Sequence, residues 1–254
     1  MTTSDRTFLL AEMTFAEVKA QIAAGRSTIV VPFGAVEQHG PHLPLDTDAV
    51  LGDRLGLLVA RRLNALCAPT IRIGCSQHHM SFAGTLSFKP ETLPLVVHDL
   101  VDSLATHGFH KIILLPTHGG NERPLTNAAA ASKRDGLMIF VASLRVTVEA
   151  LKAGTRTGGA ASDNGGHAGE LETSLMLALA PDLVRTSRME PGYTGALDDA
   201  ATAVFFNEGV AALSANGVIG DPRGSSAAAG HAYAAAFLDA VEAQLPELGQ
   251  SLPR

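Results

Sequence analysis

Short apolar runs, each followed by a polar segment and then by a helical pattern, are the feature that most constrains the fold. Three of them lie at Thr28–Phe33, Lys111–Leu115 and Leu137–Val141. Runs with so few polar residues are typical of strands buried on both faces, as in a parallel sheet covered by helices. Thr70–Ile73 fits a further strand, and Val218–Ile219 fits a short last one.

Helical patterns occupy the intervals between these runs. The helices that we expect run over 14–24, 48–64, 90–106, from a turn at 117–121 to 134, 167–180 and 227–244. This alternation predicts a three-layer α/β/α fold with a mostly parallel central sheet. No internal repeat or linker divides the chain, so we expect one domain over 1–254. The segment Gly154–Gly166, rich in small and polar residues, is expected to be a long loop that is either functional or a surface excursion, and loops of this length in compact domains are often functional.

Charge and apolar patterning exclude several classes of protein. The net charge is -6 and no block of Lys and Arg is present, so we expect no nucleic-acid partner. No apolar run approaches the length of a membrane span, and the first one, at 8–11, is too short for a signal peptide. Cys67 and Cys75 form no disulfide framework. We therefore expect a soluble cytoplasmic protein with no membrane contact.

Metal-binding residue types follow the first strand. In open parallel sheets ligands bind beyond the carboxyl ends of the strands. Glu37 and His39 stand two residues apart in an extended segment, so their side chains point to the same side, and this pair suits a divalent first-row metal. Pro41 stiffens the segment. By spacing alone Asp46 and Asp48 are equal candidates for a further ligand.

Two later segments carry similar chemistry. His118 directly follows the strand at 111–115. His167 opens the late helical pattern, where Glu170 would share its face and Glu172 would lie on the opposite side of an ideal helix. That objection to Glu172 weakens if His167 precedes the helix. Gathering Glu37, Asp48 and Glu172 without cations would be costly, because like carboxylates raise each other's pKa.

Two divalent ions would offset these carboxylates, and two-metal sites activate water for hydrolysis. The mixed His and carboxylate set does not choose among Zn, Mn and Fe. Other hydrolytic and phosphate-binding signatures (GxSxG, GxxxxGK[ST], HExxH) are absent from the sequence. These observations indicate a metal-dependent hydrolase.

The segment GAVEQHGPHLPLDTD, residues 34–48, closely resembles the signature of the creatininase family of amidohydrolases. The resemblance continues through 118–121, 167–169 and 172–174. It implies an α/β fold with a di-metal centre and a homo-oligomer, usually a hexamer. By position, Glu37 and His39 resemble ligands of the two separate metals, with Asp48 bridging them and His118 joining Glu37 on one ion. His167 resembles the histidine that handles protons during amide cleavage.

The sequence departs from the creatinine-cleaving members in two ways. Those members have a Tyr-Glu pair where this chain has Gly119-Gly120, and that glutamate binds metal; Glu172 is the expected substitute ligand, acting with His167 in catalysis. They also hold creatinine with tryptophans, and this chain has none. The resemblance therefore implies an amidohydrolase for substrates other than creatinine.

The expected reaction is cleavage of a C–N amide bond in a small molecule or short peptide by metal-activated water, with His167 protonating the leaving nitrogen. Family members with the Gly-Gly form include a formamide-cleaving deformylase and a peptidase that trims a redox-cofactor precursor peptide. A peptidase of the second kind is one alternative, and a metal-bound scaffold or binding protein without turnover is another. The pocket walls are expected to come from Phe82, small residues and the loop at 154–166.

Overall fold

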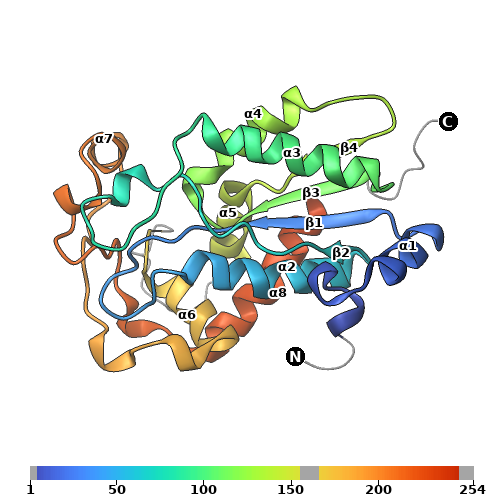
Figure 1. Cartoon of the computed structure of the whole chain (residues 1–254). Helices are drawn as coiled ribbons and strands as arrows, with labels where there is room; N and C mark the ends of the chain where they lie inside the picture. The colour runs from blue at the N-terminus through green and yellow to red at the C-terminus, as the bar shows by residue number, and fades with distance from the viewer. Residues whose placement is uncertain (1–4, 155–165, 246–254) are drawn as a thin grey trace.

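The computed structural model describes residues 5–154 and 166–245, and there the chain forms a parallel sheet between two layers of helices (Figure 1). The strands are β1 (Thr28–Phe33), β2 (Leu66–Cys67), β3 (Lys111–Pro116) and β4 (Met138–Val141). They pair in the order β2-β1-β3-β4, and every pairing is parallel. The predicted three-layer α/β fold is confirmed. The expectation of one domain over 1–254 stays a prediction.

Helices cover both faces of this sheet. They are α1 (Phe15–Ala23), α2 (Thr47–Arg62), α3 (Thr92–Thr106), α4 (Glu122–Ala131), α5 (Leu144–Gly154), α6 (Glu170–Leu179), α7 (Asp199–Asn207) and α8 (Ala227–Ala243). In Figure 1, α3 and α4 lie above the sheet, whereas α2, α6 and α8 lie below it. None of the helices in the described ranges is long and apolar enough to cross a membrane.

The alternation of side chains along β1 explains why the strand is apolar throughout. Ile29 and Val31 pack into the core under α3 and α4, whereas Val30 packs into the core formed with α2, α6 and α8. All three side chains are at most 1% exposed. Burying an aliphatic side chain of this size contributes about 1.5–3 kcal/mol. A polar residue at any of these positions would therefore weaken one of the two cores.

The strand predicted at Thr70–Ile73 is wrong in position, because the second strand pairs at Leu66–Cys67 instead. Ala68 N–H donates to Val30 O, and Ile71 N–H donates to Pro32 O. Between these two hydrogen bonds the second segment advances by three residues and β1 by two, so the regular ladder of hydrogen bonds is interrupted. Beyond that irregularity Ile71 keeps only an isolated bridge to Phe33.

Other differences concern the second half of the chain. The helices α5 and α7 were not predicted, and Val218–Ile219 forms no strand, because Ile219 makes only isolated bridges to His167 and Tyr193. The late helix α6 begins at Glu170, so His167 precedes it. Of the expected loop at 154–166, residues 155–165 lie outside the described residues.

Candidate metal centre

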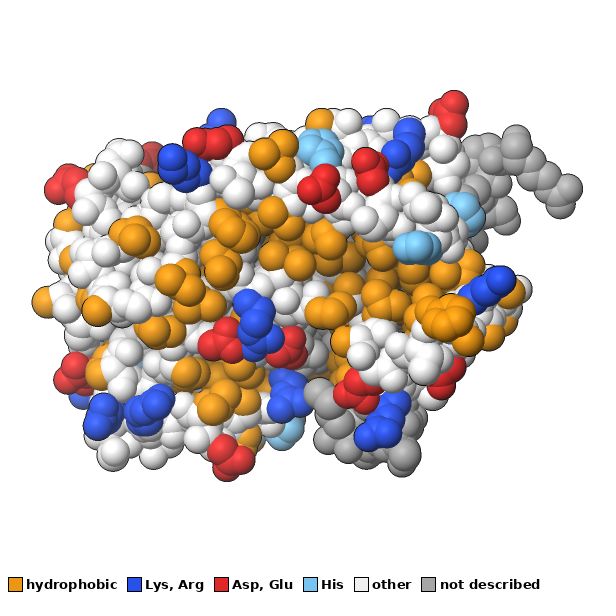
Figure 2. Space-filling model, in the orientation of Figure 1, with side chains coloured by type: hydrophobic (Ala, Val, Ile, Leu, Met, Phe, Trp, Pro, Cys, Tyr) orange, Lys and Arg blue, Asp and Glu red, His pale blue; other side chains and the backbone are white. Residues whose placement is uncertain are grey.

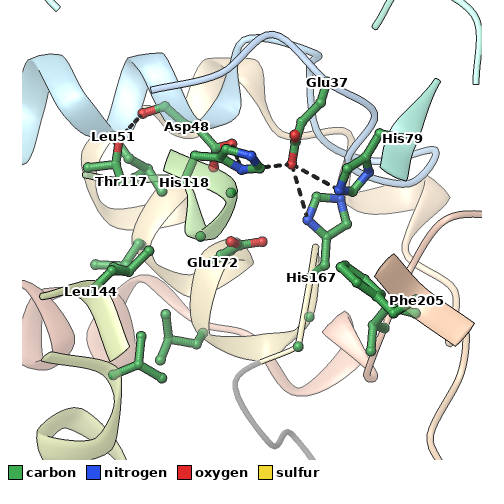
Figure 3. Close-up of a pocket in the computed structure, with 18 of the residues that line it drawn as sticks. Glu37, Asp48, Leu51, His79, Thr117, His118, Leu144, His167, Glu172 and Phe205 are labelled. Carbon is green, nitrogen blue, oxygen red and sulfur yellow. Dashed lines mark hydrogen bonds and ion pairs between the residues drawn. The ribbon is translucent and has the colours of Figure 1, made fainter. Parts of the chain in front are cut away.

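Six side chains singled out by the sequence converge beyond the carboxyl ends of β1 and β3. Figure 3 labels five of them, and the sixth, His39, lies beside Asp48. The segment after β1 supplies Glu37 and His39, and the first turn of α2 supplies Asp48. His118 lies two residues beyond the end of β3. The start of α6 and the residues before it supply the other two, Glu172 and His167. The side chains of Glu37 and His39 are completely buried.

Among the described residues, four groups of side chains could hold a metal ion, and two of these groups share Asp48. In one group, His118 Nδ1 lies 3.2 Å from Glu37 Oε1 and 3.3 Å from Asp48 Oδ2. In the other, His39 Nε2 lies 3.3 Å from Asp48 Oδ1 and 3.9 Å from Glu172 Oε2. Within each group the candidate ligand atoms all lie within 4.8 Å of one another. Asp48 therefore directs one carboxylate oxygen toward each group.

Asp46, the equal candidate by spacing, faces away from this cluster. Its carboxylate pairs with the Arg72 guanidinium at 2.5 Å, and its side chain is 37% exposed. Asp48 is 1% exposed. Asp46 directly precedes α2, whereas Asp48 lies in its first turn and points toward the cluster.

The backbone before α6 brings Glu172 to the cluster. Ala168 adopts a left-handed conformation with φ 55°, and its N–H donates to Glu172 Oε2 at 2.6 Å. Since His167 stands outside the helix, the geometric objection to pairing it with Glu172 does not apply. Glu170 points elsewhere, to the hydroxyl groups of Ser174 and Tyr233.

Backbone carbonyls orient the rings of three histidines. His39 Nδ1 lies 3.1 Å from Glu37 O, His118 Nε2 lies 3.1 Å from Cys75 O, and His167 Nε2 lies 2.6 Å from Gln38 O. Because a carbonyl oxygen only accepts, each of these nitrogens must carry the hydrogen. In the neutral ring the other nitrogen then turns a lone pair toward the cluster. Metal-binding histidines are commonly held in this way.

The buried carboxylates need a positive partner. Among the described residues, both carboxylate oxygens of Glu37, together with Asp48 Oδ2 and His39 Nε2, have no hydrogen-bond partner. An unpaired buried charge costs several kcal/mol, on the order of the desolvation penalty of one ion. Burial also raises the pKa of Glu172 to about 7. Oxygen and imidazole nitrogen ligands suit divalent Zn, Mn or Fe, so the residues fit such ions.

The cluster opens into a cavity of about 270 Å³. Aliphatic side chains from α2, α5 and α6 line it, and Figure 3 shows Leu144 on one side of Glu172 and Phe205 on the other. The expectation that Phe82 forms a wall is wrong, because the aromatic wall in the described part of the chain is Phe205 with Phe206.

Sequence reasoning missed His78 and His79, which also line the cavity. His79 Nε2 lies 3.3 Å from Glu37 Oε1, and His79 is 1% exposed. Their signal was present, since both follow the second strand region as the other candidates follow β1 and β3.

Gly120 has no room for a side chain. A Cβ atom there would lie 2.2 Å from Cys75 O and 2.5 Å from His118 Nε2, whereas a Cβ on Gly119 would meet no atom within 4 Å. The carbonyl that orients His118 therefore approaches the backbone at Gly120 closely. A glutamate at this position is incompatible with the present geometry of His118.

Comparison with known proteins shows which family and which relatives this chain resembles. The family model described as "Creatininase: Creatinine amidohydrolase" matches residues 11–245. A mycofactocin precursor peptide peptidase of Mycobacterium tuberculosis (strain H37Rv) is 35% identical over 234 residues, covering 87% of this chain and 85% of that protein. The creatinine amidohydrolase of Pseudomonas putida is 30% identical over 198 residues, covering 72% and 76%.

Solved structures agree with the fold. The structure titled "Creatininase Mn" superposes with a TM-score of 0.80 and 27% identity, over 95% of this chain and 98% of that chain. A mutant creatininase described as the Zn-Zn type gives a TM-score of 0.81 at 27% identity over the same shares.

Proposed function

The chain belongs to the creatininase family, and from that premise we propose that it is a metal-dependent amidohydrolase that cleaves a C–N amide bond in a short peptide or linear small-molecule amide. The observation that carries this proposal is the pair of ligand groups that share Asp48, each completed by one carboxylate and one imidazole. A scaffold without turnover would not need two such groups beside a cavity.

We assign Glu37, Asp48 and His118 to one divalent ion, and His39, Asp48 and Glu172 to a second. Divalent ions in paired sites activate water and polarise the scissile carbonyl. The related solved structures include a manganese form and a zinc–zinc form, which supports Mn or Zn here, with Fe also compatible with the ligands. Elemental analysis of protein purified without chelator should give close to two ions per chain.

His167 is proposed to move the proton. Burial lowers the pKa of His167 well below its usual value, so the ring is neutral before reaction. Its Nε2–H is held by Gln38 O, and Nδ1 lies 3.6 Å from Glu37 Oε1 at the edge of the cavity. Nδ1 is thus placed to accept a proton and to pass it to the leaving amine nitrogen.

The cavity supports an extended, partly apolar substrate over creatinine. Its walls are mainly aliphatic, the chain contains no tryptophan to stack on a planar ring, and Gly120 excludes the glutamate of creatinine-cleaving members. The similarity to precursor-peptide peptidases favours the peptide version of the proposal. A peptidase that trims a peptide-derived cofactor precursor is therefore the more specific candidate.

An amide panel tests the proposal. Metal-loaded protein should hydrolyse short peptides or linear amides, lose that activity with a chelator and show negligible turnover of creatinine. The His167→Ala variant should keep its metal and lose turnover by about 10²–10⁴-fold. Full activity in metal-free protein, or creatinine turnover at an ordinary enzymatic rate of about 1–1000 per second, would contradict it.

We also propose a cytoplasmic homo-oligomer, a hexamer by family resemblance. Both cysteines are free and buried, which supports a reducing compartment. Large apolar side chains remain exposed, among them Phe15 at 88% and Leu95 at 64%. Figure 2 shows apolar side chains spread across the middle of one face. Light scattering should give a native mass that is a multiple of the 26.3 kDa chain.

A further inference from the structure

His79 is held differently from the other histidines of the cluster. Its Nε2 faces Glu37 Oε1 at 3.3 Å, and neither of these atoms has a hydrogen-bond partner in the described part of the chain. Its Nδ1 faces no carbonyl. Instead it lies 2.9 Å from the side-chain Nε2 of Gln38. The orientation of the Gln38 amide therefore determines which nitrogen of the His79 ring carries the hydrogen.

Two backbone contacts settle that orientation. Gln38 Oε1 accepts the Gly40 N–H at 3.0 Å, and Gln38 Nε2 donates to Gly217 O at 3.1 Å. A flipped amide would set donor against donor at Gly40 and acceptor against acceptor at Gly217. Both contacts thus agree that the NH₂ group of Gln38 is the one that faces His79.

An amide NH₂ group only donates, so His79 Nδ1 must be the acceptor and cannot carry a hydrogen. The ring hydrogen is then on Nε2, which faces Glu37. A nitrogen that carries a hydrogen has no lone pair for a metal. We propose that His79 is a positioning residue that directs its Nε2–H toward Glu37 Oε1 and does not bind metal, and that Gln38 enforces this role.

Gln38 also determines which nitrogen of His167 carries the hydrogen. The backbone oxygen of Gln38 accepts the His167 Nε2–H at 2.6 Å, which leaves His167 Nδ1 as the acceptor. Gln38 thereby gives both rings the Nε2–H tautomer, yet His79 turns that protonated nitrogen toward Glu37 whereas His167 turns its unprotonated Nδ1 toward it. The two ring centroids lie 4.4 Å apart. Its side chain lies so close to Gly217 that a Cβ there would stand 1.9 Å from Gln38 Oε1. Gln38, although it touches no reacting atom, sets which ring donates and which accepts.

Around Glu37 Oε1 three ring nitrogens lie within 3.6 Å, from His118, His79 and His167. When all three rings are neutral, in the tautomers given above, only His79 directs a hydrogen toward this oxygen. The other two bring lone pairs, which repel it unless a cation or a proton intervenes. His79 therefore directs a hydrogen toward this carboxylate whenever the rings of His118 and His167 are neutral, as the His118 ring is when it binds an ion.

The tautomers can be read by ¹⁵N NMR of ring-labelled histidines, in metal-free protein and in the diamagnetic zinc-loaded form. We expect His79 to carry hydrogen on Nε2 in both, and His167 to carry it on Nε2. An unprotonated His79 Nε2 in the zinc form would overturn the proposal. The inference rests on the proposed metal centre only through Glu37: a wild-type chain that binds no metal would refute the function, while the metal-free spectrum would still test the tautomer.

Zinc titration of variants supplies a second test. His79→Leu should weaken the affinity for one ion by about 10–100-fold, because outer partners of ligands typically contribute that much, yet it should reach full stoichiometry at saturation. His79→Gln, whose amide can donate, should recover part of the loss. Gln38→Met should resemble His79→Leu, and the same substitution at the exposed Gln77 is the matched control. A stoichiometry one ion short at saturation in His79→Leu would identify His79 as a ligand and overturn the proposal.

Discussion

At the scale of single residues, the two aspartates at the start of α2 give the sharpest contrast. Asp48 directs one oxygen toward each ligand group, whereas Asp46 is paired with Arg72 at the surface. We therefore expect Asp48→Ala to lose both ions and Asp46→Ala to keep metal content close to wild type. Elemental analysis of the two purified variants checks this. Retention of both ions by Asp48→Ala would show that the shared carboxylate is not needed.

Gly119 and Gly120 offer a second contrast between neighbours. Gly120→Ala would force a Cβ against Cys75 O, so we expect it to destabilise the fold by roughly 1–3 kcal/mol, the usual cost of overpacking. Gly119→Ala, with open space around its Cβ, should change the free energy of unfolding far less. Denaturant unfolding of both variants measures the difference. Equal stability of the two would mean that the backbone at Gly120 yields easily.

The candidate site could be predicted largely because its residues stand in one short motif and just after strands. Asp48 could be separated from Asp46 only through the family resemblance, since spacing along the chain does not show which way a helix start turns. The roles of His79 and Gln38 were not predicted, because they depend on the contacts of His79 with Glu37 and Gln38 and of Gln38 with Gly217, and these partners are distant in the sequence. Hydrogen-bond direction of this kind is a property of the folded chain.

At the scale of elements, α5 forms one wall of the cavity but supplies none of the proposed metal ligands, so a substitution on it can change substrate binding without changing metal binding. Val148 lines the cavity, whereas Val146 on the same helix is 40% exposed. We expect Val148→Phe to lower kcat/KM for substrates with a bulky apolar side chain by about tenfold, the equivalent of about 1.4 kcal/mol, while metal content is unchanged. Val146→Phe is the matched control. Steady-state kinetics on a peptide series tests it, and an effect of equal size in both variants would contradict this placement of the substrate.

Elements with a continuous apolar run were predicted well, because β1 and β3 are buried on both faces and leave a clear signal. The second strand was misplaced because β2 is only two residues long and its ladder is broken before Ile71. Neither α5 nor α7 was expected. Both nevertheless contribute to the cavity, because α5 supplies Leu144 and Val148 and α7 supplies Phe205.

At the scale of the whole molecule, the parallel sheet explains why ligands from distant segments meet. The segments after β1 and β3 emerge at the same edge, since these neighbouring strands run in the same direction. Glu172 arrives from α6, which packs against α2 and α8 on one side of the sheet. The proposed ligands therefore come from both the sheet and one helical layer. Ions bound to them should increase the free energy of unfolding of the whole fold.

Metal removal tests that coupling. Without ions the buried Glu37 and Asp48 are offset only by His39 and His118, whose pKa values the two carboxylates raise despite burial. Two divalent ions would offset their desolvation more fully, so we expect the metal-free chain to unfold at a lower temperature. An ion held at 100 times its dissociation constant adds about 2.7 kcal/mol to the free energy of unfolding. Calorimetry with chelator and then with restored zinc should show a fall and a recovery of Tm. Asp48→Ala should show neither, and a Tm of the wild type that is indifferent to zinc would mean that the buried carboxylates are satisfied without ions.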